Sequence, residues 1–188
     1  MSLETGKILA GVGAILAGVG VFYSIILAII GLILFLVGMI ELADSLNEPG
    51  IKDNTVKWFI FSLLALIVLA VGVFMGLLAA LPIPLISIYR QIMPFHAPYV
   101  PYMMHSFIWI LVWVAIFLVV AAVLFILSAR YLSNAMDGLA RRTSEGLFRI
   151  GGRIYFIGAI LTIIAIGVIL IPIAFIIIGI ALLVVKIS

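Results

Sequence analysis

The chain has 188 residues, of which 68% are hydrophobic and 9% are charged, and its mean hydropathy is +1.53. Soluble domains are about 45–50% apolar and about 25% charged, so this composition excludes a water-soluble fold and is typical of a protein surrounded by lipid. The absence of cysteine excludes disulfides, thiolate metal sites and thiol catalysis. The net charge of +3 rests on ten basic residues, too few to favour nucleic acid as a partner.

Charged residues divide the chain into four uncharged stretches, each long enough to cross a bilayer. The stretches are Ile8–Ile40, Trp58–Tyr89, Gln91–Ala129 and Ile154–Val185. The first and the last are longer than the about 20 residues that one crossing needs, and turn-favouring residues lie near their middles, at Gly18–Ser24 and Gly167–Pro172. We therefore predict two helical hairpins, over residues 3–46 and 149–187.

Five prolines between residues 82 and 101 interrupt the remaining apolar sequence. Proline removes a backbone donor and disfavours a helical residue before it. The prolines therefore predict an outer loop over 81–101, between spans at 57–80 and 102–131. Within this loop, Pro84–Met93 fits a short helix that lies flat on the membrane.

Together these segments predict an all-α fold: a polytopic transmembrane helical bundle formed by a single domain over 1–188, with about six spans or, alternatively, four long ones. Six spans place nine of the ten basic residues on one face and leave Arg90 alone on the other, whereas four spans divide them seven to three. We therefore expect a multi-pass protein of the cell membrane with both termini in the cytoplasm. The apolar start of the chain exceeds the core of a signal peptide, so we expect it to be retained.

The first and last hairpins resemble one another in sequence. Gly6–Leu16 parallels Gly152–Leu161, and Gly31 corresponds to Gly179 after an insertion of three residues. The similarity predicts a parallel repeat, with both hairpins starting on the same face. The alternative is chance, because helices rich in Gly, Ala, Ile and Leu align easily.

Several segments of the first seventy residues carry a family resemblance. The opening Leu3–Lys7, the glycine-spaced first helix, Glu41–Ala43 at the end of the second helix and the following Ile51–Asp53 resemble an archaeal family of small polytopic membrane proteins, known only as a domain of unknown function. The resemblance is strongest over about residues 1–70. It implies an archaeal membrane protein and implies no activity.

The outer loop combines aromatic residues with an arginine that has no acidic neighbour in sequence, Arg90. Such an arginine fits a lipid phosphate or a partner's carboxylate. The loop is either an aromatic belt at the membrane surface or a surface that docks a partner. The candidate lipid or partner contacts are Arg90, Tyr89, Phe95, His96, Tyr99, Tyr102, Trp109 and Trp113, together with Arg141 and Arg142 on the cytoplasmic side.

Two histidines, His96 and His105, are the only ones in the chain. They are nine residues apart, and the outer loop offers no acidic residue to complete a coordination sphere. We therefore predict no metal site and no cofactor, and interpret both histidines as interfacial side chains.

The segment Asp137–Arg141 is similar to the core motif of the membrane phosphotransferases that join alcohols to cytidine-diphosphate lipids. Its spacing is one residue short, and no aspartate follows Asp137 to hold a metal ion. We therefore predict no catalytic residue, and expect Asp137 and Arg141 to pair one helical turn apart on an exposed helical extension. Glu41 is the acidic residue nearest the apolar core, and its predicted place near the interface argues against an ion pump.

These features predict a non-catalytic accessory or structural subunit of a membrane assembly, with membrane lipids, other membrane subunits or a second copy as partners. Small residues spaced by four, in Ala10–Gly18 and Gly72–Ala80, fit packing within the chain or between subunits. The alternative is a small channel or carrier for a neutral solute. Its path would need the few polar residues of the spans, which are Ser62, Ser106, Ser128 and Thr162.

Overall fold

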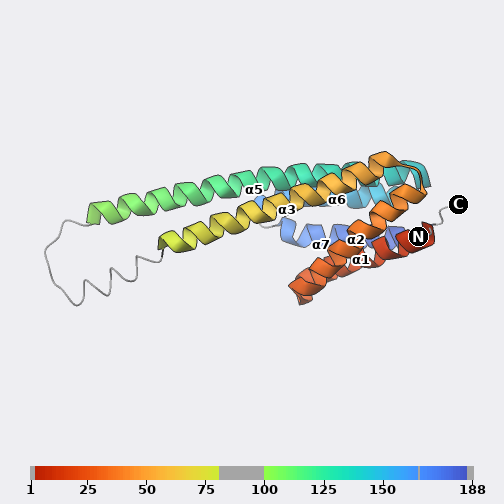
Figure 1. Cartoon of the computed structure of the whole chain (residues 1–188), viewed down its shortest axis with the longest axis horizontal. Coiled ribbons are helices and arrows are strands. Elements are labelled where there is room, and N and C mark those ends of the chain that lie inside the picture. Colours follow the sequence, from red (N-terminus) through yellow and green to blue (C-terminus); the bar gives the residue numbers. More distant parts are fainter. Residues whose placement is uncertain (1–2, 81–99, 165, 186–188) are drawn as a thin grey trace. The chain divides into compact units, whose positions relative to one another are not determined.

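The computed structural model describes residues 3–80, 100–164 and 166–185, and within them every regular element is a helix. The elements are α1 (Leu3–Tyr23), α2 (Ile25–Ser45), α3 (Pro49–Ala80), α5 (Val100–Thr143), α6 (Gly146–Leu161), a 3-10 turn (Thr162–Ile164) and α7 (Gly167–Val184) (Figure 1). All of these helices except α6 are long and apolar enough to cross a membrane. The predicted all-α polytopic bundle is confirmed.

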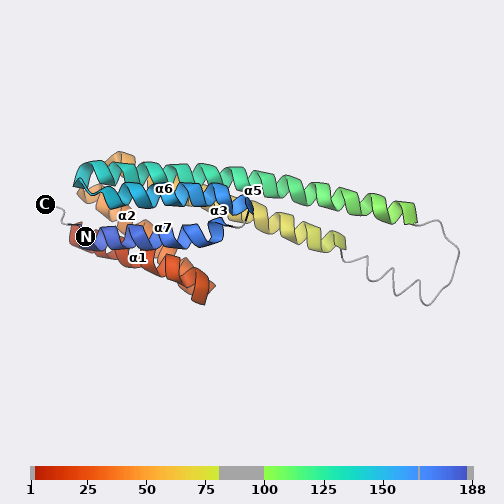
Figure 2. The ribbon, with the colours of Figure 1, turned by 180° about the vertical axis from the view of Figure 1, so that it is seen from behind.

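The chain forms two compact units. The hairpin unit comprises Met1–Ser62 and Phe125–Ser188, and the helix-pair unit comprises Leu63–Leu124. In the hairpin unit, α1 packs on α2, α6 packs on α7, and α1 also packs on α7 (Figure 2). In the helix-pair unit, the second half of α3 lies beside the first half of α5.

Both predicted hairpins occur, but the second one turns just before Gly167, and Pro172, which we predicted at the turn, lies inside α7. Ser24 alone separates α1 from α2, and its N–H donates to the Gly20 carbonyl at 2.8 Å. The second turn follows α6, where Thr162 Oγ1 donates to the Gly158 carbonyl at 2.9 Å. With 16 residues, α6 is about 24 Å long, shorter than the about 30 Å of a hydrocarbon core. Among the described helices of the predicted spans it is the shortest, and the one not long enough to count as a candidate membrane span.

The start of α3 differs from the prediction. The helix begins at Pro49 rather than at Lys57, since proline suits the first position of a helix, where its missing N–H needs no partner. Ile51, Thr55 and Trp58 are buried, and their spacing of four and then three residues places them on one helical face. These first turns are thus amphipathic, and their charged residues occupy the opposite side.

α5 continues past the predicted span end at Tyr131 as far as Thr143, and this extension, which we predicted to be exposed, has a buried face. Leu132, Met136 and Leu139 are fully buried, at spacings of four and three residues. Arg130 marks the end of the uncharged stretch but not the end of the helix, because the buried apolar face continues past it.

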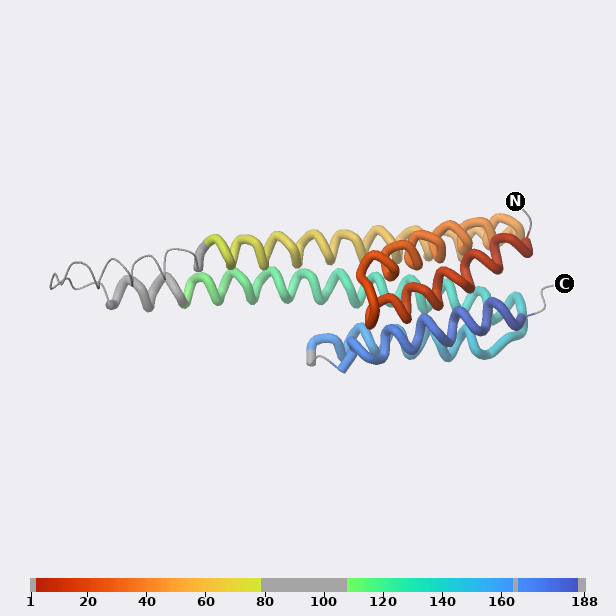
Figure 3. Tube along the Cα trace, turned by 90° about the horizontal axis from the view of Figure 1, so that it is seen from below, coloured from red at the N-terminus to blue at the C-terminus, as the bar shows by residue number. Residues whose placement is uncertain are grey.

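Close approach between helices explains the glycines of α1, which lies between α2 and α7 (Figure 3). A Cβ added to Gly13 would lie 2.8 Å from the Gly31 carbonyl oxygen of α2, and one added to Gly18 would lie 2.7 Å from the Pro172 carbonyl oxygen of α7. Small residues let helix backbones meet at these distances. The row Ala10–Gly18 therefore packs within the chain.

Glycines paired by the predicted repeat show both agreement and difference. Gly13 faces α2, and its counterpart Gly158 faces Ile171 of α7, so each meets the second helix of its own hairpin. Gly31 and Gly179 both face α1, which is the same hairpin for Gly31 and the other hairpin for Gly179. The repeat stays a prediction.

Candidate functional site

A buried aromatic cluster joins four helices of the hairpin unit. The ring centroid of Trp58 on α3 lies 5.4 Å from that of Phe35 on α2 and 6.1 Å from that of Phe175 on α7. Tyr155 of α6 completes the cluster, with its ring centroid 5.3 Å from that of Phe175. Aromatic pairs at such separations contribute about 0.5–1.5 kcal/mol beyond the burial of their area. The cluster therefore stabilises the packing of α2, α3, α6 and α7 against one another.

Hydrogen bonds extend this cluster to α5. Trp58 Nε1 donates to Tyr155 Oη at 3.1 Å, and Ser128 Oγ donates to the Trp58 carbonyl at 2.9 Å. Ser62 Oγ lies 2.6 Å from Ser128 Oγ. Buried polar groups in an apolar surrounding need such partners. Ser62 and Ser128, two of the serines proposed for a solute path, are thus used in joining α3 to α5.

Ion pairs gather at the charged ends of α2, α3, α5 and α6. They are Lys57–Asp53 at 2.6 Å, Lys52–Asp44 at 2.8 Å, Arg149–Asp137 at 3.6 Å and Arg142–Glu48 at 4.0 Å. All are at least one-third exposed, so solvent screens them and each contributes little to stability. Asp137 pairs with Arg149 of α6 rather than with the predicted Arg141, because α6 packs alongside this part of α5. Within the described ranges, no three His, Cys, Asp or Glu side chains group as metal ligands.

A shallow apolar groove runs along the helix-pair unit, with a volume of about 220 Å³. Its lining residues are Gly72, Met75 and Gly76 of α3 and Ile110, Trp113, Val114 and Phe117 of α5. A Cβ added to Gly72 would lie 2.5 Å from Phe117 Cβ, so this glycine serves the packing of α3 on α5. Trp113 is 59% exposed at the groove.

The predicted contact residues fall into three groups. Tyr89, Arg90, Phe95, His96 and Tyr99, like the flat helix predicted over 84–93, lie outside the described residues. Tyr102 and His105 belong to α5, as do Trp109 and Trp113, whose side chains are about half exposed. Arg141 and Arg142 are exposed in the last turn of α5 and belong to the hairpin unit. The two tryptophans belong to the other unit.

Sequence reasoning missed the aromatic cluster as a site. The available signal was the spacing of Thr55, Trp58 and Ser62, which places two hydroxyls and an indole on one face of an apolar helix. Nothing in the sequence pointed to Tyr155 as their partner, because 97 residues separate it from Trp58.

The apolar helices and their buried hydrogen bonds define a polytopic helical membrane protein. The family model described as protein of unknown function (DUF996) matches residues 27–185, and the chain belongs to this family. The match begins within α2, so Leu3–Lys7 lies before it, whereas it covers most of the chain beyond residue 70. No curated protein and no solved structure matches the chain.

Proposed function

We propose that the protein is a non-catalytic accessory or structural subunit of an archaeal membrane assembly, and that its helix-pair unit docks a transmembrane helix of another subunit. The observation that carries this proposal is the exposure of that unit. In the most apolar stretch of each helix, 6% of residues are buried in α5 and 11% in α3, against 44% in α1 and in α7.

The groove supplies a shape for such a partner. Gly76 lines the groove from α3 and has no side chain to fill it, and Trp113 presents a large exposed ring from α5. Residues 63–80 and 108–124 of this unit, which include the groove, carry no ionisable side chain, so the complementary surface is an apolar helix that packs by shape. Aromatic anchors in such positions often carry much of the binding free energy.

The carrier alternative has less support among the described residues. Ser62, Ser128 and Thr162 all bond to partners within the chain. A solute would have to replace these bonds, and each buried group left without a partner costs about 1–3 kcal/mol.

Photo-crosslinking in native membranes tests the docking proposal. A photoreactive phenylalanine analogue in place of Trp113 should give a discrete adduct with another membrane protein, because it lines the groove. The matched control replaces Phe74, which is 61% exposed in the same unit and does not line the groove. The control should give mainly lipid adducts.

Two results would contradict the proposal. Lipid adducts alone at both positions would mean that no subunit docks on the groove. An adduct with a second copy of the chain would replace the accessory subunit with a homo-oligomeric scaffold.

Cysteine labelling tests the proposed membrane orientation. The chain has no native cysteine, so each introduced cysteine reports only its own position. A membrane-impermeant maleimide should label Ser24→Cys in intact cells and should label Ser144→Cys only after permeabilisation, because six spans place these exposed turns on opposite faces. An unlabelled Ser24→Cys that remains unlabelled after permeabilisation would favour four spans instead.

A further inference from the structure

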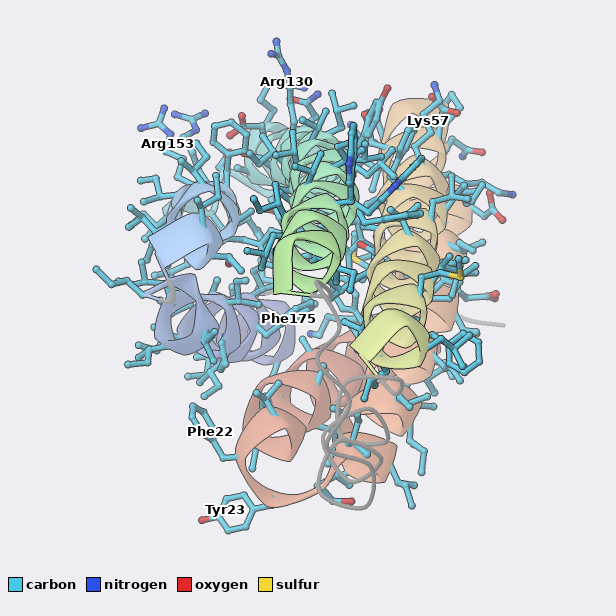
Figure 4. The ribbon with its side chains drawn as sticks, turned by 90° about the vertical axis from the view of Figure 1, so that its left-hand side faces the viewer. Phe22, Tyr23, Lys57, Arg130, Arg153 and Phe175 are labelled. Atoms are coloured by element: carbon cyan, nitrogen blue, oxygen red, sulfur yellow. The ribbon has the colours of Figure 1, made fainter. Side chains whose placement is uncertain are left out.

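Two exposed arginines of the hairpin unit, Arg130 of α5 and Arg153 of α6, point away from the helices on the same side (Figure 4). Neither has an ion-pair partner within the described part of the chain. Lys57 also points outward in this view, but it is already paired with Asp53 at 2.6 Å. The two arginines therefore leave two positive charges uncompensated.

The packing of α6 on α5 brings these arginines near one another. A Cβ added to Gly152 would lie 2.9 Å from Met136 Cβ and 3.2 Å from Ser133 Cα, so the residue before Arg153 directly contacts α5. Arg153 of α6 is therefore close to the level of Ser133 of α5. Arg130 lies about one helical turn, or about 5 Å, from Ser133 along α5. The two arginines therefore extend on the same side of neighbouring helices, from levels about one turn apart.

The side chains near Arg130 and Arg153 are charged toward one end of α5 and α6 and apolar toward the other. Toward the charged end, Asp137 of α5 forms an ion pair with Arg149 at 3.6 Å, so its carboxylate already has a basic partner. On the other side, toward the apolar stretches, Leu127 is 41% exposed and Ile157 is 50% exposed. These apolar residues lie about one turn from Arg130 and Arg153 on the same helical faces.

We infer that Arg130 and Arg153 form a binding site for an anionic phospholipid, with its phosphate between the two guanidinium groups and an acyl chain against Leu127 and Ile157. Arginine presents paired donors that match phosphate oxygens, and basic residues at this boundary attract anionic headgroups. A site that combines two arginines with apolar side chains binds a lipid more tightly than a free phosphate ion, because the ion has no acyl chain to contact Leu127 and Ile157. The inference is independent of any partner on the helix-pair unit.

Native mass spectrometry of the full chain in mild detergent tests this site, with phosphatidylglycerol and phosphatidylcholine of identical acyl chains as probes. The wild-type chain should retain phosphatidylglycerol preferentially. The double variant Arg130→Gln/Arg153→Gln should bind it about tenfold more weakly, because two charge contacts are lost. The matched control Lys52→Gln/Lys57→Gln removes the same charge from the start of α3, where both lysines are paired with aspartates, and should bind like wild type.

Three outcomes would overturn the inference: equal retention of both lipids, equal losses in the double variant and its control, or displacement of the lipid by millimolar inorganic phosphate. Thermal unfolding in the same detergent checks that the variants are folded. If the glutamine variant is unfolded, Arg130→Lys/Arg153→Lys replaces it. This variant keeps the charges but loses the paired donor geometry, so binding should still fall, by about threefold.

Discussion

Replacement of Gly31 with valine is expected to lower the free energy of unfolding by about 3 kcal/mol or more. A Cβ at this position would lie 2.7 Å from the Leu16 carbonyl carbon and 2.8 Å from Ala17 Cα. Both are backbone atoms of α1 and cannot rotate away, so the two helices must separate. Unfolding in mixed micelles of mild detergent and SDS, followed by circular dichroism, measures the change.

Gly50→Val is the matched control for this substitution. Gly50 is also helical, in the first turn of α3, and a Cβ there meets nothing within 4 Å. Its stability should stay within about 0.5 kcal/mol of wild type. Equal stability of the Gly31 and Gly50 variants would contradict the close packing of α1 on α2.

Replacement of Trp58 with alanine is expected to cost about 4 kcal/mol of stability. The side chain is 1% exposed, its ring packs between Phe35 and Phe175, and it donates to Tyr155. Its loss leaves a cavity and also removes the hydrogen bond that joins α3 to α6. The same unfolding assay applies, with secondary structure rather than tryptophan fluorescence as the signal.

Two further variants separate the effect of the lost hydrogen bond from that of the lost ring, and a buried tryptophan from an exposed one. Trp58→Phe keeps an aromatic ring and loses the N–H donor, so its cost should be smaller, with about 1 kcal/mol from the lost hydrogen bond. Trp113→Ala removes a ring that is 59% exposed and should leave stability nearly unchanged. A large loss in Trp113→Ala, or none in Trp58→Ala, would contradict the positions assigned to these two tryptophans.

Helix positions were largely predictable, because the cost of exposing backbone groups to lipid leaves few alternatives to helix in such apolar stretches. The turns at Ser24 and before Gly167 followed from small residues in the middle of long apolar sequences. Boundaries at charged ends were less predictable. Charged residues predict a start of α3 at Lys57 and an end of the span in α5 at Tyr131, whereas a buried face continues through both segments.

The candidate sites were less predictable than the helices. Trp109 and Trp113 were singled out from sequence, and both are exposed on α5. The arginine pair of the proposed lipid site was only part of a longer basic run, in which Arg149 and Arg142 proved to have acidic partners. Which arginines stay unpaired depends on where α6 lies against α5.

By itself, the sequence determined that this is an all-helical membrane protein, where its hairpins turn and which residues carry charge. The tertiary structure decided that Gly13 faces α2 while Gly18 faces α7, that Trp58 meets Tyr155 and that Arg130 and Arg153 project on the same side. The physical reason is that lipid accepts apolar side chains on every side of a helix. Apolar periodicity then marks the buried face only weakly, and contacts between distant residues become known only once the helices are packed.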